Sequence, residues 1–318
     1  MKQIIKLLVI SIALSQLSAC TEDSENRESF DIEGRHIEFL ASMPTDDTQM
    51  TRVGLEQASG SLTLIPKWKD GDQVHLFILH QNKIIDIGSV SVRNIQPDGK
   101  SCGFDINLPA SMENITNYVI YGICSDTGVE AQVSGNKIVF NCKLMRKPNS
   151  QFKAPVYFIA QGGLKVVQAN FKHLGTYEII HLKNKSSKIS YFRVKEMRAK
   201  EKWFHEEAIF DVSSASVTAK TPTNPIGTGT GTLLPGVEGT FVSWYLPTGK
   251  KMTTTTLVAV IDGNEVTSTN TKSSNVSFER GRSYHMYVEW DGSKLRFVNA
   301  SKGDNGNCEL KDMQGQKL

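Results

Sequence analysis

From residue 35 onward, hydrophobic and polar positions alternate with a period of two, which is typical of β-strands that bury one face. Turn-forming residues interrupt the alternation about every eight to fifteen positions. This spacing favours a β-sandwich over an alternation of strands with helices. In the first half of the chain the pattern predicts strands over residues 36–39, 61–65, 74–79, 83–92, 103–108, 118–123, 137–140 and 154–160, with a hairpin at 134–136.

The second half continues in the same way. The pairs Asp262-Gly263 and Asp291-Gly292 predict tight hairpin turns, because these residues accept the positive φ angles that such turns need. Residues 196–208 have a helical composition, but their apolar positions keep no 3.6-residue period, so we expect strand and loop there. The stretch 221–235 is rich in Thr, Gly and Pro and predicts an exposed loop. Strands are predicted over residues 177–182, 188–197, 240–246, 253–261, 265–269, 275–278, 284–290 and 295–298.

The N-terminus has the pattern of a lipoprotein signal peptide. Lys2 and Lys6 precede or begin an apolar run that is too short to span a bilayer, and small residues lead to Cys20. We predict that residues 1–20 are the signal segment and that Cys20 carries the lipid, including palmitate. Several acyl chains on one residue would hold the protein stably at the outer membrane. Residues 21–34 are acidic and polar and predict a solvated tether, and the acidic run behind Cys20 favours exposure on the cell surface.

Length and charge bound the remaining possibilities. The chain has 318 residues, 36 Lys and Arg, 33 Asp and Glu, and a net charge of +3, which falls to about +1 without Lys2 and Lys6. So small a charge argues against nucleic acid as a partner. About 298 residues after the signal segment suit two domains better than one. We therefore predict an all-β protein with an N-terminal sandwich at 35–168, a C-terminal sandwich at 169–300 and a polar tail at 301–318.

The search for reactive groups gives no catalytic, cofactor or metal site. The seven histidines are scattered, and none lies at metal-ligand spacing with a third ligand nearby. The glycines at 227–231 lack the lysine of a phosphate-binding loop. We therefore expect a protein that is not an enzyme and needs no cofactor. Cys102, Cys124 and Cys142 could form one disulfide or remain three buried thiols, and Cys308 lies in the tail.

Several short motifs, taken in order, resemble the Bacteroidales fimbrillin-like lipoproteins, which are subunits of type V pili. The resemblance covers nearly all of residues 20–298. It rests on the lipidation motif, Met50-Thr51-Arg52, the run from Trp68 to Phe77, residues 104–109 and 118–122, Phe171-Lys172-His173-Leu174, Trp244-Tyr245-Leu246-Pro247 and residues 278–284.

The resemblance implies two tandem transthyretin-like β-sandwich domains of antiparallel Greek-key type. It also implies export as a lipoprotein, trimming by an arginine-specific protease, and assembly with other pilus subunits by β-strand complementation. A vacated strand position exposes unpaired backbone groups and an apolar trench that another chain can fill. Arg52 is the candidate cleavage site, Arg35 is the alternative, and a plain surface arginine at position 52 remains open.

The end of the chain departs from a stalk subunit. Residues 299–318 contain only Ala300, Leu310, Met313 and Leu318 as apolar positions, which makes a poor donor strand. A tip or accessory subunit is therefore favoured, with a host or bacterial surface ligand as a further partner, while an anchor that keeps its lipid remains open. The alternative from another class is a stand-alone surface glycan-binding lipoprotein. Trp203 is the one tryptophan that we expect to be free for such binding.

Overall fold

The computed structural model describes residues 35–44, 56–57, 64–65, 67–125, 129–135, 137–143, 145–147, 155–223, 229–273, 277–299, 314 and 316. Within these ranges the chain forms strands and their connections, together with one 3₁₀ turn, η1 (Ala110–Met112), and no α-helix. The predicted all-β class is confirmed. The transthyretin-like form and the Greek-key connections of the predicted domains stay predictions.

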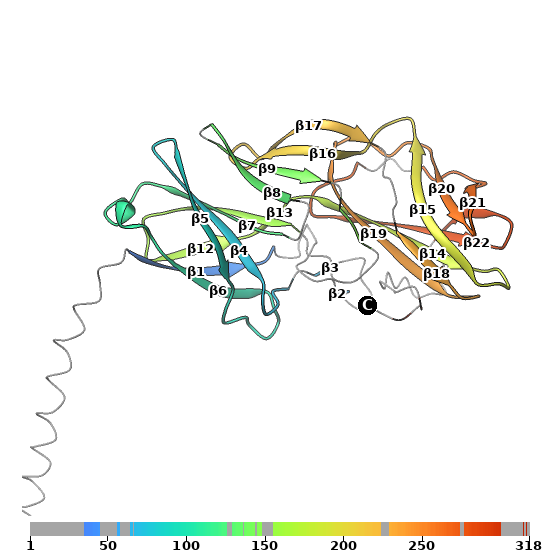
Figure 1. Cartoon of the computed structure of the whole chain (residues 1–318), viewed down its shortest axis with the longest axis horizontal. Coiled ribbons are helices and arrows are strands. Elements are labelled where there is room, and N and C mark those ends of the chain that lie inside the picture. Colours follow the sequence, from blue (N-terminus) through green and yellow to red (C-terminus); the bar gives the residue numbers. More distant parts are fainter. Residues whose placement is uncertain are drawn as a thin grey trace, which may run out of the picture. The chain divides into compact units, whose positions relative to one another are not determined.

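Most of the predicted strands are present, whereas the strands at residues 166–170 and 216–223 were not predicted. Figure 1 labels most of the strands of the chain. In chain order they are β1 (His36–Ser42), β2 (Glu56–Gln57), β3 (Leu64–Ile65), β4 (Gln73–His80), β5 (Lys83–Ser91), β6 (Ser101–Asn107), β7 (Val119–Cys124), β8 (Val129–Ser134), β9 (Lys137–Lys143), β10 (Met145–Lys147), β11 (Val156–Gln161), β12 (Val166–Asn170), β13 (Lys172–His173), β14 (Thr176–Asn184), β15 (Ser190–Ala199), β16 (Phe204–Asp211), β17 (Ser216–Thr223), β18 (Thr230–Leu233), β19 (Glu238–Pro247), β20 (Thr255–Ile261), β21 (Asn264–Thr267), β22 (Ser283–Trp290) and β23 (Leu295–Val298).

The chain divides into two compact units, and each is described by itself. The smaller unit comprises residues 1–37 and 106–115, of which 35–37 and 106–115 are described. In it the backbone N–H of Leu108 donates to the carbonyl of Arg35 at 3.0 Å. The side chains of His36 and Asn107 are also hydrogen-bonded, at 3.1 Å. These two contacts tie the start of the described chain to the segment around residue 107.

The larger unit comprises residues 38–105 and 116–318 and contains most of the strands. A five-stranded sheet has the order β13-β11-β7-β4-β5, and all of its pairs are antiparallel. On β4, Leu76 and Ile78 are buried on one face and Phe77 is buried on the other. Both faces of this strand are therefore covered in its middle, which explains why its sequence is continuously apolar from Leu76 to Leu79.

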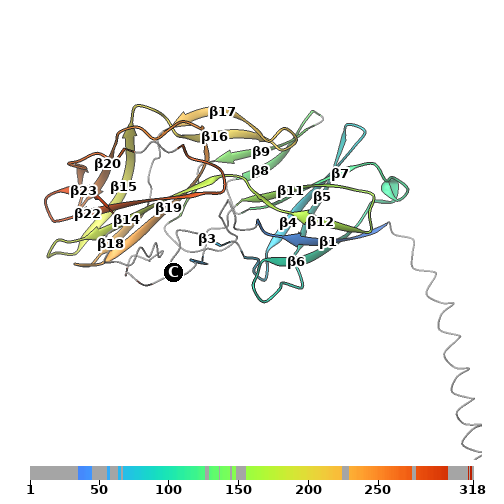
Figure 2. The same cartoon turned by 180° about the vertical axis from the view of Figure 1, so that it is seen from behind.

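A nine-stranded sheet takes strands from both sides of the boundary predicted near residue 168. Its order is β23-β22-β14-β19-β16-β9-β8, with β10 paired to β19 and β17 paired to β16. The side-by-side course of β9 and β16 is visible from both directions (Figures 1 and 2). The strands of the first sequence half are thus hydrogen-bonded to strands of the second. The division into two domains stays a prediction, and the hydrogen-bonded sheet continues across the predicted boundary.

Among the described residues of the larger unit, buried side chains form hydrophobic cores, and two of these cores involve the nine-stranded sheet. The first places Tyr157 against Phe140 and Phe210, with ring centroids 6.2 and 5.2 Å apart, and it also includes the predicted core residue Trp244. The second centres on Phe204, whose ring stacks on Tyr245 at 4.0 Å. The first core uses aromatic residues from both halves of the sequence, as the nine-stranded sheet does, so the burial of each half depends on the other.

The turns agree with the sequence at one hairpin and differ at another. Asp262 and Gly263 have φ angles of +49° and +86° and connect β20 directly to β21, which confirms the tight turn. The connection between β22 and β23 contains the four residues from Asp291 to Lys294, as the predicted strand bounds imply, but of the Asp-Gly pair only Gly292 has a positive φ, +99°. There the carboxylate of Asp291 accepts hydrogen bonds from the backbone N–H groups of Ser293 and Lys294. This carboxylate takes over the role that a second residue with positive φ would have had.

The predicted loop at 221–235 is partly wrong. The end of β17 lies in it, and so does the whole of β18, which pairs with β15 between Leu233 and Ser190. Leu233 is fully buried in the second core. The composition rich in Thr and Gly concealed a short edge strand, because Thr favours strands as readily as turns.

Candidate functional site

The strand β1 lies inside a three-stranded sheet of order β12-β1-β6. On one side, residues 38–42 pair in parallel with residues 166–170 of β12. On the other side, the backbone N–H of Met43 donates to the carbonyl of Lys100, just before β6, at 2.9 Å. The strand is therefore hydrogen-bonded along both edges, and its loss would leave two strands without a partner.

The side chains of β1 alternate strictly between the protein interior and the solvent. Phe39 and Ala41 are buried, as is Met43 beyond the strand end, whereas Leu40 is 51% exposed. Phe39 stacks on Phe104 with ring centroids 4.6 Å apart and an interplanar angle of 14°. The same ring lies 6.1 Å from Phe158. One strand thus supplies a row of apolar side chains to an aromatic cluster.

The C-terminal end of β1 makes a polar contact. The hydroxyl of Ser42 donates to Oδ1 of Asn170 at 2.7 Å, at the end of the parallel pair with β12. This contact and the strand register fix where β1 stops. The sequence did not show this partner, because residues 166–170 were placed at the domain boundary and were not predicted as a strand.

The structure separates the two candidate cleavage positions. Arg35 is described and directly precedes β1, whereas Arg52 and the predicted lipidation site Cys20 lie outside the described residues. A cut after Arg35 would leave β1 attached to the remaining chain, because β1 begins at His36. A cut after Arg52 would detach it. Both site predictions, Cys20 and Arg52, stay predictions.

The expectation that Trp203 is a free aromatic side chain is wrong. Trp203 is 0% exposed and stacks on Phe278, with ring centroids 5.5 Å apart. Trp68, Trp244 and Trp290 are buried, as predicted. Charged and polar neighbours, Lys202, His205 and Glu206, suggested a solvated segment, but β16 begins at Phe204 and carries this region into the second core.

Two histidines that the sequence analysis treated as scattered lie together. His181 on β14 and His285 on β22 are hydrogen-bonded between Nε2 and Nδ1 at 2.9 Å. The parallel pairing of these strands brings them together across 104 residues. Nδ1 of His181 lies 3.5 Å from Oε1 of Glu238. Burial, followed by the charge of His181, lowers the pKa of His285 to about 3.

Across the described ranges, no cluster of three or more His, Cys, Asp or Glu side chains has the geometry to hold a metal ion. Cys102, Cys124 and Cys142 are buried and form no disulfide, which decides between the two states that the sequence left open for these three residues. Burial raises the pKa of Cys102 to about 12 and that of Cys142 further still. In the part of the chain that is described, no helix is long and apolar enough to cross a bilayer.

No protein-family model matches the chain. No curated protein is similar to it in sequence.

Among solved structures the chain is similar to a candidate cell adhesion protein from Bacteroides ovatus, with 14% sequence identity and a TM-score of 0.46, covering 83% of this chain and 95% of that one. It is similar to a fimbrial protein from Bacteroides vulgatus at 10% identity and a TM-score of 0.45, covering 84% and 98%. The fimbrial anchor protein Mfa2 from Porphyromonas gingivalis follows at 8% identity and a TM-score of 0.32, covering 83% and 95%. These three neighbours are described as fimbrial or cell adhesion proteins.

Proposed function

We propose that this protein is a structural or adhesive subunit of a type V pilus, exported as a lipoprotein and assembled by strand exchange after trimming of its N-terminus. The position of β1 is the observation that carries the proposal. The strand lies between β12 and β6, and it supplies buried side chains to an aromatic cluster. A strand in this position can be replaced only by another strand with the same alternation.

Removal of β1 would create a binding groove for such a replacement. The two flanking strands would lose their hydrogen-bond partners, and the rings of Phe104 and Phe158 would lose the contact with Phe39. Each buried aromatic or aliphatic side chain contributes about 1.5–3 kcal/mol. The vacated site would therefore favour an incoming strand with apolar residues at every second position, which is the physical basis of β-strand complementation.

Arg52 is the cleavage site that this function requires. The tether, β1 and the chain up to residue 52 would leave together, and the lipid on Cys20 would leave with them. Under this proposal the lipid delivers the subunit to the outer membrane and cell surface and is then discarded. The apolar residues of the tail at 301–318 make a poor donor strand, so we place the subunit at the pilus tip or in an accessory position.

Limited proteolysis tests the proposal directly. Treatment of the purified protein with an arginine-specific protease, followed by mass spectrometry, should give a new N-terminus at Val53 in the wild type and in Arg35→Ala, but none there in Arg52→Ala. Because the tail is a poor donor strand, the trimmed protein alone should stay monomeric, and it should bind an added strand with alternating apolar residues that the uncut protein does not bind. A trimmed protein that binds no such strand, or an uncut protein that binds it equally well, would contradict strand exchange.

Synthetic peptides test the groove itself. A peptide of residues 36–43 should bind the trimmed protein but not the uncut protein, whereas the same peptide with Phe39→Asp should bind neither. The peptide separates strand complementation from unrelated association, because only the former depends on the buried face of β1.

A further inference from the structure

A β-bulge on β5 builds a polar cluster that the sequence did not reveal. On the partner strand β4, Leu76 pairs with Gly88 and Phe77 pairs with Asp86, so that Ile87 is the extra residue. Gly88 has a φ of +88°, a conformation that glycine accepts without strain. Asp86 and Ser89 are three residues apart and would face opposite sides of a regular strand. The bulge brings both to the side of His75.

The three side chains are hydrogen-bonded in series. Oδ1 of Asp86 lies 2.7 Å from Nε2 of His75 and also accepts a hydrogen bond from the N–H of Gly88 at 2.8 Å. Nδ1 of His75 lies 3.3 Å from the hydroxyl of Ser89. The imidazole ring also stacks on Phe77, with centroids 4.6 Å apart. The histidine is therefore held by contacts on two edges and one face.

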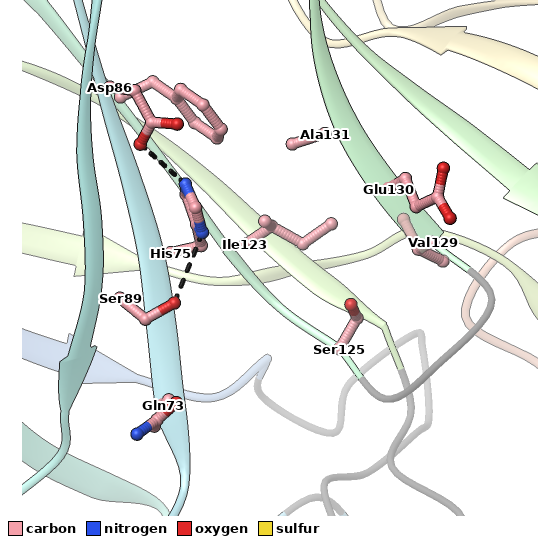
Figure 3. Close-up of a pocket in the computed structure, with 10 residues that line it drawn as sticks. Gln73, His75, Asp86, Ser89, Ile123, Ser125, Val129, Glu130 and Ala131 are labelled. Atoms are coloured by element: carbon pink, nitrogen blue, oxygen red, sulfur yellow. Dashed lines mark hydrogen bonds and ion pairs between the residues drawn. The ribbon is translucent and has the colours of Figure 1, made fainter.

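This cluster forms one wall of a pocket of about 450 Å³. Figure 3 shows His75 between Asp86 and Ser89, with Val129 and Ala131 on β8 across the pocket. Phe77, Ile123 and Ser125 also line it, as does Gln73 at the far end of the polar wall. Glu130 lies at the rim, and its side chain points away in the figure, as strand alternation requires.

The two walls differ in chemistry, and the difference restricts the ligand. One wall offers a carboxylate, an imidazole, a hydroxyl and an amide, whereas the other is aliphatic. No lysine or arginine is among the described lining residues, so nothing there compensates the charge of an anionic ligand. A ring with an apolar C–H face and hydroxyl groups at its edge satisfies both walls. The volume suits a ligand of one or two such rings.

The same three residue types perform acyl transfer in hydrolases, but the geometry here favours binding. Ser89 lies within β5 opposite His75, in a segment of the strand that pairs with β4. A hydrolase presents its serine on a sharp turn beside free backbone N–H groups that stabilise an oxyanion. The side chain of Asp86 is also 59% exposed, whereas the aspartate of a catalytic triad is buried.

We propose that the pocket between β4, β5 and β8 is a binding site for a neutral carbohydrate. Asp86, Ser89 and Gln73 bind the sugar hydroxyls, and Val129 and Ala131 pack against the ring. His75 orients Asp86 and Ser89 and offers its exposed edge to the ligand. The site is independent of the strand exchange proposed above, because it uses neither β1 nor its two neighbouring strands.

A glycan array with the protein lacking residues 1–20 gives the first test. Neutral glycans ending in a hexose, fucose or N-acetylhexosamine should bind, and sialylated or sulfated glycans should not be preferred. Isothermal titration with the best neutral glycan then compares matched variants. Ala131→Trp fills the pocket, and Asp86→Ala removes its acceptor. Gln132→Trp makes the matched change on the other face of β8, and Asp70→Ala removes an exposed aspartate that does not line the pocket.

The first two variants should weaken binding at least tenfold, and the two controls should stay within twofold of the wild type. A measurement on the unmutated protein keeps the proposal testable if a variant fails to fold. The bound glycan should slow acylation of His75 by diethyl pyrocarbonate and leave His80 unaffected. Binding that persists in Ala131→Trp, a preference for acidic glycans, or no neutral glycan bound at all would overturn the proposal. Binding of the strand peptide to the trimmed protein reports on strand exchange separately.

Discussion

His181 and His285 share a single hydrogen bond, 2.9 Å between Nε2 and Nδ1, although 104 residues separate them in the chain. One proton suffices for this bond, so the bond accommodates a neutral His285. Glu238, Ser283 and Tyr287 surround the pair: the first lies 3.5 Å from His181, the second contacts His285 at 3.2 Å, and the third stacks on His181 at 4.5 Å.

This pair predicts sensitivity to mild acid. The pKa of His285 is lowered to about 3 in the folded protein, whereas an unfolded histidine titrates near 6.5. The unfolded state therefore binds the proton first, and stability should be complete above pH 6.5 and fall as the pH decreases from 6.5 toward 3. The slope is at most about 1.4 kcal/mol per pH unit. Denaturant unfolding at several pH values measures it, and a slope that His285→Gln does not reduce would contradict the assignment.

A buried carboxyl predicts the opposite trend. Glu178 is fully buried and accepts a hydrogen bond from the hydroxyl of Tyr245 at 2.7 Å. Burial raises its pKa to about 8, against the effect of that bond. The protonated form stabilises the fold below the unfolded pKa, near 4.5, and this contribution is lost as the pH rises toward 8. Glu178→Gln should remove the loss and stabilise the protein at pH 8 by roughly 1–3 kcal/mol. The exposed Glu207→Gln is the matched control and should change little.

The two faces of β1 predict contrasting effects of neighbouring substitutions. Phe39→Ala removes a buried ring from the cluster with Phe104 and should destabilise the protein by about 3–5 kcal/mol. Leu40→Ala alters a side chain that is 51% exposed and should stay within about 0.5 kcal/mol of the wild type. Chemical denaturation of both variants gives the comparison. Equal losses would mean that β1 does not bury the face described.

A pair of glycines tests the packing around Phe158. A Cβ at Gly122 would lie 2.0 Å from the ring of Phe158, whereas a Cβ at Gly103 would meet only backbone oxygens at 3.6 Å or more. Gly122→Ala should therefore destabilise by about 1–3 kcal/mol through overpacking. Gly103→Ala should be tolerated. The melting temperatures of the two variants, recorded together, measure the difference, and a stable Gly122→Ala would show that the ring has room to move.

Local pattern was enough to place most of the strands. Alternation along β4 and the turn at Asp262-Gly263 follow from side-chain direction and backbone φ, which depend on neighbours in sequence. The strand β12 was missed because its five residues carry only two buried apolar positions, Val167 and Ala169. Its pairing with β1 is long-range, and no local preference encodes it.

The candidate sites were harder to predict for the same reason. The position of β1 as a removable strand followed from the resemblance, and the structure supplies its neighbours. The cluster around His75 depends on a bulge at Ile87 that shifts Asp86 by one position, and a bulge of this kind leaves only Gly88 as its signal in the sequence. Trp203 was wrongly predicted to be exposed, because its neighbours in sequence are charged. Its stacking partner, Phe278, lies 75 positions away in the chain.

The nine-stranded sheet has a mechanical consequence. Strands from before and after residue 168 share one ladder through the pair β9–β16, so tension that reaches either half passes through backbone hydrogen bonds into the other. Stretching in an optical trap should therefore give one dominant rupture rather than two steps of similar size. Under the proposed pilus function, a subunit linked in this way would behave as a stiff segment within a fibre, whereas two separately hinged domains would extend under load.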